Sequence, residues 1–358
     1  MKTTHIVLKT QAMATRDIFR GGSSATRRPV TGLSAETIDI DRHQIAQVTR
    51  DASVVAIAPA MPMRLVAPFD FGAIAPVAQS VTWGVRAVGA DISPMTGAGV
   101  VVAVLDTGID AGHPAFAGMQ LVQNDFSGEG DGDRNGHGTH CAGTIFGRAV
   151  NGTRIGVAPG IRRALIGKVL NEHGGGSSEN IVAAILWAAD QGAHVISMSL
   201  GIDFGGYVKM LIDRGMPVEL ATSRALEGYR TNTRLFDTLA DHIKARGRES
   251  QPTLIVAAAG NESRRDQDPD FEVAVSPPAV AEGIVSVAAL GEGQGGWRTA
   301  PFSNTGANLS GPGVNIVSAA MGGRPAFAKR HQHGSPARCG RGRTVGPAAD
   351  GKKRPQRI

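Results

Sequence analysis

Asp106 is the first residue whose position suggests catalysis. It ends an apolar run at residues 100–105 and is followed by Thr107 and Gly108. A carboxylate at the end of a buried strand stands where α/β sheets place their active sites. A strand-terminating aspartate that only bonds a turn would give the same pattern, so this segment alone leaves both interpretations open.

His137 is the second such residue, within the segment NGHGTHCAGT at residues 135–144. Glycines bracket the histidine and small residues follow it, so a helix could begin here and pack closely. His137 and His140 could instead share a helical face as metal ligands. The glutamate that a metalloprotease helix carries between its histidines is absent.

Asn261 is the third candidate and follows a strand-like run at residues 254–259 and Gly260. Its side-chain amide could donate a hydrogen bond to an oxyanion that develops during acyl transfer. An asparagine that ends a strand in a turn is the simpler alternative.

Together, the order and spacing of these three segments resemble the subtilisin-like serine peptidases, or subtilases. The resemblance covers about residues 80–320 and includes WGV at 83–85, ISMSLG at 196–201 and FSN at 302–304. Cys141 is similar to the thiol that lies under the catalytic imidazole in the proteinase K branch. The resemblance implies a hydrolase, a serine endopeptidase that acts on proteins or peptides.

The resemblance also implies a role for each residue. Asp106 would orient His137, His137 would be the general base, and Asn261 would complete the oxyanion hole. One edge would pair with an extended substrate as an added strand, and small residues would line the main specificity pocket. The residues implied in substrate binding are Ser199, Leu200, Gly201, Ala257, Ala258, Ala259 and Gly260.

The nucleophile, which subtilisin places after the aspartate and the histidine, is missing. The family motif Gly-Thr-Ser-Met-Ala-x-Pro-His-Val-Ala-Gly should follow shortly after residue 320. Ser335 is followed by PAR rather than by a helix of small residues. We therefore assign no nucleophile in this chain and expect it to be inactive as written.

A change of reading frame accounts for the missing motif. One permitted set of GC-rich codons for residues 329–347, read one nucleotide later, encodes Ser-Gly-Thr-Ser-Met-Ala-Arg-Pro-His-Val-Ala-Gly-Val-Ala-Ala-Leu-Trp-Ala. The methionine requires the pair His333-Gly334, and the tryptophan requires Val345-Gly346; both pairs are present. We hypothesise that the frame changes between about residues 320 and 329.

The charge distribution agrees with this hypothesis. The chain has 358 residues, of which 42% are hydrophobic and 19% charged, enough for a large core. Its net charge of +6 arises in residues 321–358, where 10 basic residues face one acid, whereas the remainder holds 27 basic and 30 acidic residues. We expect this tail to be disordered. Polyanion binding through a genuine basic tail is the alternative.

The elements that must position the candidate residues follow an α/β pattern. Apolar runs at residues 100–105, 164–170, 195–200, 254–259 and 284–289 are typical of strands buried on both faces of a parallel sheet. Between two of them a helix begins at Ser177 or Ser178 and ends at Gly192. We expect a three-layer subtilisin-like α/β fold, incomplete at its C-terminus. Residues 203–250 form a polar insertion, partly helical around 233–245.

Residues 1–75 are mixed and irregular, with short strands expected at 5–9 and 54–58. The second of these resembles the end of the propeptide that chaperones and inhibits many subtilases. Cleavage would then fall between about Met63 and Val81. We therefore expect a reduced propeptide at 1–75, a catalytic domain at 80–320 and a basic tail at 321–358.

The acids Asp125, Glu129, Asp131 and Asp133 lie among glycines and could hold a structural Ca²⁺. The spacing does not match an EF-hand, and a solvated acidic turn is the alternative. We expect no required cofactor.

Protein or peptide substrates are the partners we expect, for a monomer without nucleic-acid or membrane partners. No apolar run reaches the length of a membrane span, about 18 residues. The start lacks a signal-peptide pattern, which predicts the cytoplasm, whereas the resemblance implies export. A non-catalytic pseudoprotease that binds extended peptides is the alternative function.

Overall fold

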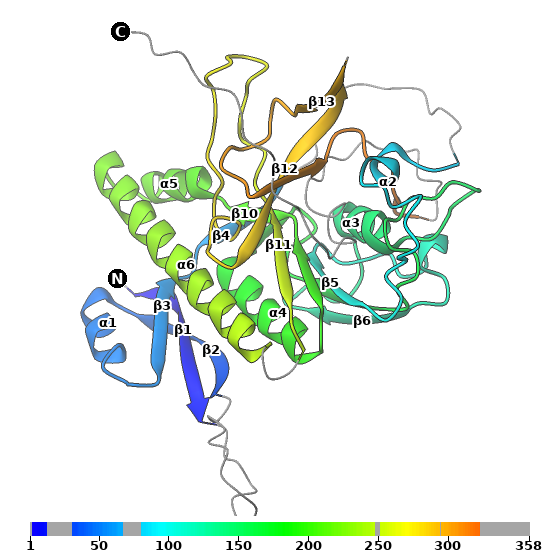
Figure 1. Ribbon diagram of the computed structural model, residues 1–358. Coiled ribbons are helices and arrows are strands. Elements are labelled where there is room, and N and C mark those ends of the chain that lie inside the picture. Colours follow the sequence, from blue (N-terminus) through cyan, green and yellow to red (C-terminus); the bar gives the residue numbers. More distant parts are fainter. Residues whose placement is uncertain (1, 13–30, 67–79, 248–250, 294, 323–358) are drawn as a thin grey trace, which may run out of the picture.

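A computed structural model describes residues 2–12, 31–66, 80–247, 251–293 and 295–322. The strands of its largest sheet are β5 (Val101–Asp106), β6 (Gln120–Asp125), β7 (Arg163–Lys168), β9 (Val195–Met198), β11 (Leu254–Ala258), β12 (Ile284–Gly293), β13 (Gly296–Thr299) and β14 (Leu309–Pro312). They lie in the order β13-β12-β11-β9-β5-β7-β6, with β14 beside β12 (Figure 1). Only the pairing of β12 with β13 is antiparallel among these strands. The expected central parallel sheet is confirmed.

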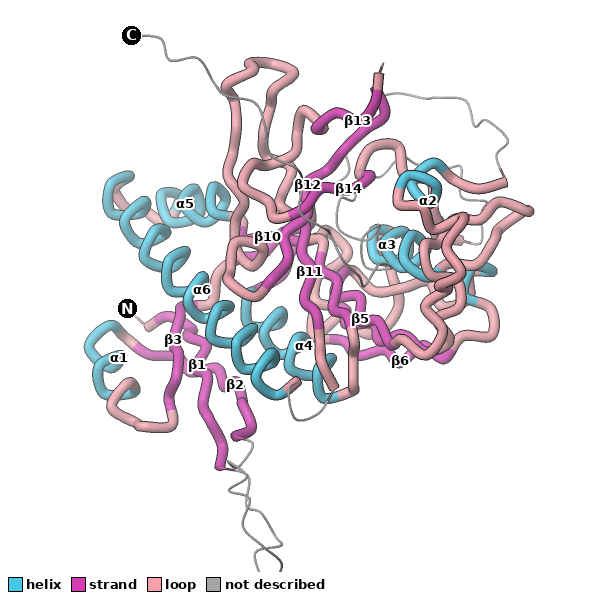
Figure 2. Tube along the Cα trace, viewed as in Figure 1, coloured by secondary structure: helices cyan, strands magenta, loops and turns pink. Residues whose placement is uncertain are grey.

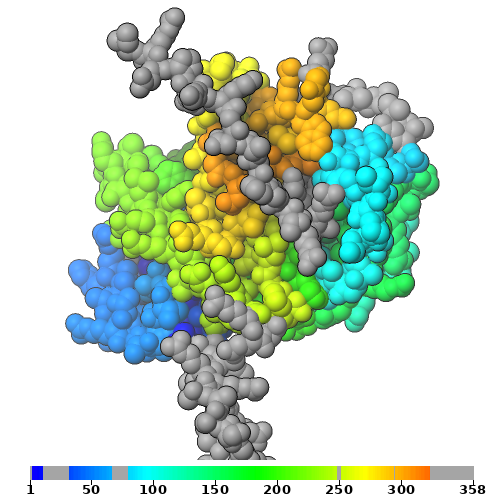
Figure 3. Space-filling model, in the orientation of Figure 1, coloured from blue at the N-terminus to red at the C-terminus, as the bar shows by residue number. Residues whose placement is uncertain are grey.

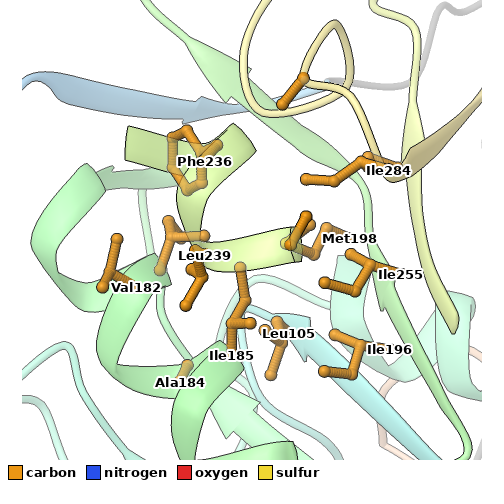
Figure 4. Packing of buried hydrophobic residues seen from close by; sticks show 14 of the residues in the cluster. Leu105, Val182, Ala184, Ile185, Ile196, Met198, Phe236, Leu239, Ile255 and Ile284 are labelled. Atoms are coloured by element: carbon orange, nitrogen blue, oxygen red, sulfur yellow. The ribbon is translucent and has the colours of Figure 1, made fainter. Parts of the chain in front are cut away.

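Helices cover both faces of this sheet because alternate residues of its strands are apolar on both sides. In β5, Val102 and Val104 pack in the cluster that contains α3 (His137–Phe146). Ala103 and Leu105 pack in the opposite cluster, with α4 (Ser178–Asp190) and α6 (Val218–Arg246). Figure 4 shows Leu105 of the sheet beside Ile185 of α4, and Met198 of the sheet and Phe236 of α6 belong to the same cluster. The structure is therefore three-layered, as expected.

Ser199 interrupts the apolar run expected as one strand at residues 195–200. β9 ends at Met198, and β10 (Leu200–Ile202) turns away to join a second sheet of order β10-β4-β8. The partners of β10 there are β4 (Pro62–Leu65) and β8 (Gly175–Ser177). The expected cap of the following helix is confirmed, since the Ser177 side chain accepts from the Glu179 N–H.

The insertion is almost wholly helical, formed by α5 (Phe204–Asp213) and the 29-residue α6. The helix expected around 233–245 is thus only the second half of α6. The first half of α6 buries Ala221, Ala225 and Gly228. Because these residues are small, the sequence shows no apolar periodicity that would predict a helix there.

In the N-terminal region, the strands expected at residues 5–9 and 54–58 are confirmed, but residues 2–12 and 31–66 form regular strands and a helix rather than an irregular segment. Its strands β1 (Thr3–Ala12), β2 (Thr31–Ile40) and β3 (Val54–Pro59) form an antiparallel sheet of order β2-β1-β3, with α1 (Arg42–Val48) connecting β2 to β3. This unit packs against α6 (Figures 1 and 3). Ile6 and Leu8 belong to the same apolar cluster as the central sheet, so the unit shares the main core.

Two short helices lie on the α3 side: α2 (Trp83–Ala87), seen beside α3 in Figure 2, and η1 (Pro114–Phe116), which contacts α3. Within the part of the chain that the structure describes, no helix is both long and apolar enough to cross a membrane. The disordered tail is predicted at residues 321–358 and the frame change between about residues 320 and 329; both fall mostly on residues 323–358, which lie outside the described residues.

Candidate active site

Asp106 and His137 form a buried pair at the carboxyl end of β5. Asp106 ends the strand and His137 begins α3, and both side chains are at most 2% exposed. His137 Nδ1–H donates to Asp106 Oδ1 over 2.7 Å, and the Thr107 N–H donates to the same oxygen over 2.8 Å. The arrangement holds the imidazole in one orientation, as a general base requires.

Two glycines allow the strand end and the helix start to meet. A Cβ at position 138 would lie 2.1 Å from the Gly108 carbonyl oxygen, so no larger residue fits. Gly108 has a φ of +107°, and a Cβ there would lie 2.3 Å from the Gly132 oxygen. Close backbone contact therefore requires glycine at positions 108 and 138, whereas Gly136, on the other side of His137, has a left-handed φ of +97°.

Asp133 joins these segments, a role that the sequence analysis missed. Its carboxylate accepts from Thr107 Oγ1 at 2.9 Å, the Gly136 N–H at 2.8 Å and the Thr139 N–H at 2.9 Å. The Asp133 carboxylate thereby accepts hydrogen bonds from backbone N–H groups at the start of α3 that have no partner within the helix. A negative charge is also favourable at this end of a helix. An aspartate shortly before a predicted helix start is a usable signal for such a cap.

Two further acids of the predicted calcium loop, Asp125 and Glu129, also have protein partners. The Glu129 carboxylate lies 3.3 Å from Nζ of Lys168, a lysine that is 2% exposed. Burial raises the pKa of Asp125, but hydrogen bonds from Ser127 and Gly130 outweigh it, so the pKa falls below its usual value. The calcium site stays a prediction.

The Cys141 thiol lies against His137, with Sγ 3.6 Å from Nδ1 and 3.8 Å from Ser199 Oγ. Burial and the nearby Asp106 charge raise the pKa of this thiol well above its usual value. Asp106, His137 and Cys141 offer metal-ligand atoms within 4.8 Å of one another. A metal here would have to displace the thiol proton, because metals bind the thiolate.

His140 is not paired with His137 as a metal ligand would be. Its Nε2–H donates to the Ile316 carbonyl over 3.0 Å, away from the Asp106–His137 hydrogen bond. The two imidazoles thus have different partners, which disfavours the paired-histidine alternative.

A strand from the N-terminal region pairs with residues 200–202, at the edge that the sequence analysis assigned to substrate binding. Leu65 lies opposite Leu200 and Arg64 opposite Gly201, in antiparallel register. Beyond the end of β4, the Val66 N–H donates to the Ser199 carbonyl over 3.0 Å. On its other side, β4 pairs with β8 and the Leu65 N–H donates to the Gly174 carbonyl over 2.8 Å. Residues 62–66 therefore lie in the position expected for an extended peptide.

Asn261 follows β11, which lies beside β9 with Ala257 opposite Met198. The parallel order β5-β9-β11 brings Asp106, Ser199 and Asn261 to the same sheet edge. The Asn261 N–H donates to Glu262 Oε2 over 3.0 Å. The structure thus gathers the predicted residues, but it tests neither the oxyanion role nor the other assigned roles.

The predicted specificity pocket is not evident among the described residues. Ala257, Ala258 and Ala259 are buried at the end of β11 and just beyond it. An open pocket of about 540 Å³ lies instead along β4, lined by Arg64, Asp203 and the loop at residues 171–177, among others. The alanine-lined pocket stays a prediction.

The last described residues return to the start of α3. Ser318 Oγ donates to the His140 carbonyl over 2.8 Å. A Cβ on Gly143 of α3 would lie 2.4 Å from that hydroxyl oxygen. The Gly322 N–H then donates to Asp110 over 3.0 Å, in the loop that follows Asp106. The chain therefore reaches Gly322 close to the Asp106–His137 pair.

Comparison with known proteins gives consistent matches. Residues 97–338 match the model of the Subtilase family. A thermostable alkaline protease of Halalkalibacterium halodurans is 34% identical over 69% of this chain and 58% of its own length. A thermophilic serine proteinase of a Bacillus species is 32% identical over 66% of this chain and 50% of its own length. Subtilisin Savinase of Lederbergia lenta is 34% identical over 67% of this chain and 75% of its own length. The chain thus spans little more than half the length of the first two relatives.

Proposed function

This chain belongs to the subtilase family and is by family a serine endopeptidase, and we propose that its site is that of a peptidase whose nucleophile lies in the adjacent reading frame. The buried Asp106–His137 hydrogen bond of 2.7 Å carries this proposal. In this mechanism His137 takes the proton of the attacking serine and later gives it to the leaving amine, while Asp106 stabilises the imidazolium. Asn261 donates its amide to the oxyanion.

The path of the chain before Gly322 supports the reading-frame part of the proposal. The segment at residues 316–322 runs along α3 and ends beside the loop that follows Asp106. A serine motif encoded a few residues later would enter the site from there. Loss of the serine costs subtilisin itself about 10⁶-fold in turnover, so the chain as written would not cut at a useful rate.

The N-terminal unit acts in this proposal as a covalently attached inhibitor. Residues 62–66 occupy the edge at residues 199–202 with backbone hydrogen bonds on both sides. An added strand of this kind gains affinity from main-chain bonds and blocks the same edge to a substrate. This supports the propeptide interpretation of residues 1–75, with processing near Val66.

The second candidate function is peptide binding without cleavage. The pairing of β4 with β8 and β10 favours it, because this contact needs no nucleophile. In this case the encoded chain is a pseudoprotease that binds extended peptides in place of residues 62–66.

Resequencing the gene across codons 310–358 is the first test, followed by labelling with a fluorophosphonate probe. We expect the encoded chain to remain unlabelled and a frame-restored chain to be labelled, with Asp106→Asn slowing the labelling. Labelling of the encoded chain would show that it has a nucleophile and would refute the reading-frame proposal.

A further inference from the structure

Arg64 is the cation of the strand that occupies the peptide-binding edge. Its Nη2 lies 2.7 Å from Glu262 Oε1, and its Nη1 lies 3.4 Å from Asp203 Oδ1. Asp203 caps α5 and Glu262 follows β11, so the two acids come from separate parts of the body. A single basic side chain of β4 thus meets two carboxylates that are distant in sequence.

Glu262 is held in place without help from Arg64. Its Oε2 accepts from the Asn261 N–H at 3.0 Å and from Asn304 Nδ2 at 2.7 Å, which leaves Oε1 directed at the arginine. A Cβ on Gly260 would lie 2.3 Å from Asn304 Nδ2, so this glycine makes the arrangement possible. The carboxylate is therefore preorganised to receive a cation.

The Asp203 carboxylate has a partner outside β4 as well. Its Oδ1 accepts from the Gly206 N–H over 3.1 Å at the start of α5. The Asp203 N–H also donates to the Pro62 carbonyl of β4 over 2.9 Å, but the carboxylates of both acids keep these other partners, so we expect both to stay in place when residues 62–66 leave the edge. The pocket along β4, lined by Arg64 and Asp203, leaves room for a long side chain beside them.

The register of β4 defines which peptide residue meets these acids. Val66 donates its N–H to the Ser199 carbonyl, and Arg64, two residues earlier, lies opposite Gly201. Any peptide bound in this register presents its corresponding side chain on the same face. We infer that Asp203 and Glu262 select peptides with a basic residue two positions before the residue bonded to Ser199. This inference rests on the proposed binding of peptides at the same edge.

The expected preference is modest because the ion pairs are partly exposed. The Arg64 side chain is 46% exposed, and those of Asp203 and Glu262 are 28% and 27% exposed. Pairs of this kind contribute little, and salt screens them. We expect a basic residue to improve binding by about three- to tenfold at low salt.

The test uses full-length chain carrying Arg64→Gln, whose own strand no longer offers a guanidinium. Two fluorescent peptides are titrated by anisotropy, one copying residues 60–66 (AMPMRLV) and one with norleucine in place of arginine. The resident strand lowers the apparent affinity of both peptides by the same factor, so their ratio still reports the preference. Glu262→Gln is added to remove the charge while keeping an acceptor for Asn261, and the exposed Glu292→Gln serves as control.

We expect the arginine peptide to bind more tightly, with the difference lost in Glu262→Gln and in concentrated salt but kept in Glu292→Gln. Equal affinities for the two peptides would overturn the inference while leaving peptide binding intact. A preference that survives combined Glu262→Gln and Asp203→Asn would overturn it as well. Binding of neither peptide would refute the proposed binding of peptides at this edge by the encoded chain. Thermal unfolding of each variant, compared with the parent, confirms that it is folded.

Discussion

Met61 is the side chain that anchors the strand lying in the peptide-binding edge. It is 1% exposed, and its Sδ lies 2.9 Å from where a Cβ on Gly228 of α6 would stand. Its backbone N–H donates to Ser178 Oγ over 3.0 Å, and its carbonyl accepts from the Ser178 N–H over 2.9 Å. Met61 therefore connects residues 62–66 to both α4 and α6.

Met61→Ala should release this strand without unfolding the body. Removing a fully buried methionine side chain costs about 2–5 kcal/mol. We take about 2 kcal/mol, the low end of that range, because the two backbone bonds to Ser178 remain. This corresponds to about a 30-fold increase in the open fraction of the strand.

Hydrogen exchange of single amides measures this opening. The amides of Leu65 and Val66, which donate to Gly174 and Ser199, should exchange about 30-fold faster when opening precedes exchange. The His194 amide, which donates to Val101 in the central sheet, should not change. Met95→Ala is the matched control, since Met95 is 75% exposed.

Two results would refute the reasoning. An acceleration below about threefold at Val66 would mean that the thioether contributes little to docking, against the range expected for buried methionine. An equal acceleration at His194 would mean that the substitution destabilises the whole chain. In either case the N-terminal unit would not be a separately releasable inhibitor.

Three further predictions concern the site. Burial and the charge of Asp106 raise the pKa of Cys141, so little of its thiol is ionised near pH 8. Iodoacetamide should therefore modify Cys141 far more slowly in the native chain than in concentrated urea, and mass spectrometry measures both rates. Gly143→Ala places a Cβ 2.4 Å from Ser318 Oγ, so urea unfolding should show a loss of about 1–3 kcal/mol. A frame-restored chain should cut itself directly before Ala67, giving that residue as the new N-terminus, and Asp106→Asn should slow this step by about 10⁴-fold.

Each of these has a control and an outcome that contradicts it. Fast native alkylation of Cys141 would show that the thiol is neither buried nor beside a carboxylate. Gly205→Ala, at a helical position with open space around it, should be neutral or stabilising; a loss equal to that of Gly143→Ala would remove the steric argument. Processing at any bond other than the one before Ala67 would show that β4 does not present the scissile bond.

The sequence alone was sufficient where the signal is local. A buried strand, a small-residue helix start and a serine cap each depend on neighbouring residues, so β5, the start of α3 and the Ser177 cap could be predicted. The pair Asp106 and His137 followed from the same local motifs, because the glycines around them are required by close backbone approach.

Features that depend on distant pairing needed the tertiary structure. Residues 62–66 join β8 and β10 through backbone hydrogen bonds, which do not depend on the side chains and therefore cannot be predicted from them. The first half of α6 buries small residues such as Ala221, and β2 is mostly polar, so neither gave a usable pattern.

The contacts that hold the site together are likewise decided by the fold. In the sequence, Asp133 is one of several acids in an acidic loop. In the structure, its carboxylate accepts hydrogen bonds from backbone amides at the start of α3. Arg64 and Glu262 are nearly 200 residues apart and meet only because β4 pairs with β10, which contacts β11. Sequence patterns report what each segment needs locally. The pairing of charged side chains depends on chain topology, because an ion pair leaves no periodic pattern in the sequence.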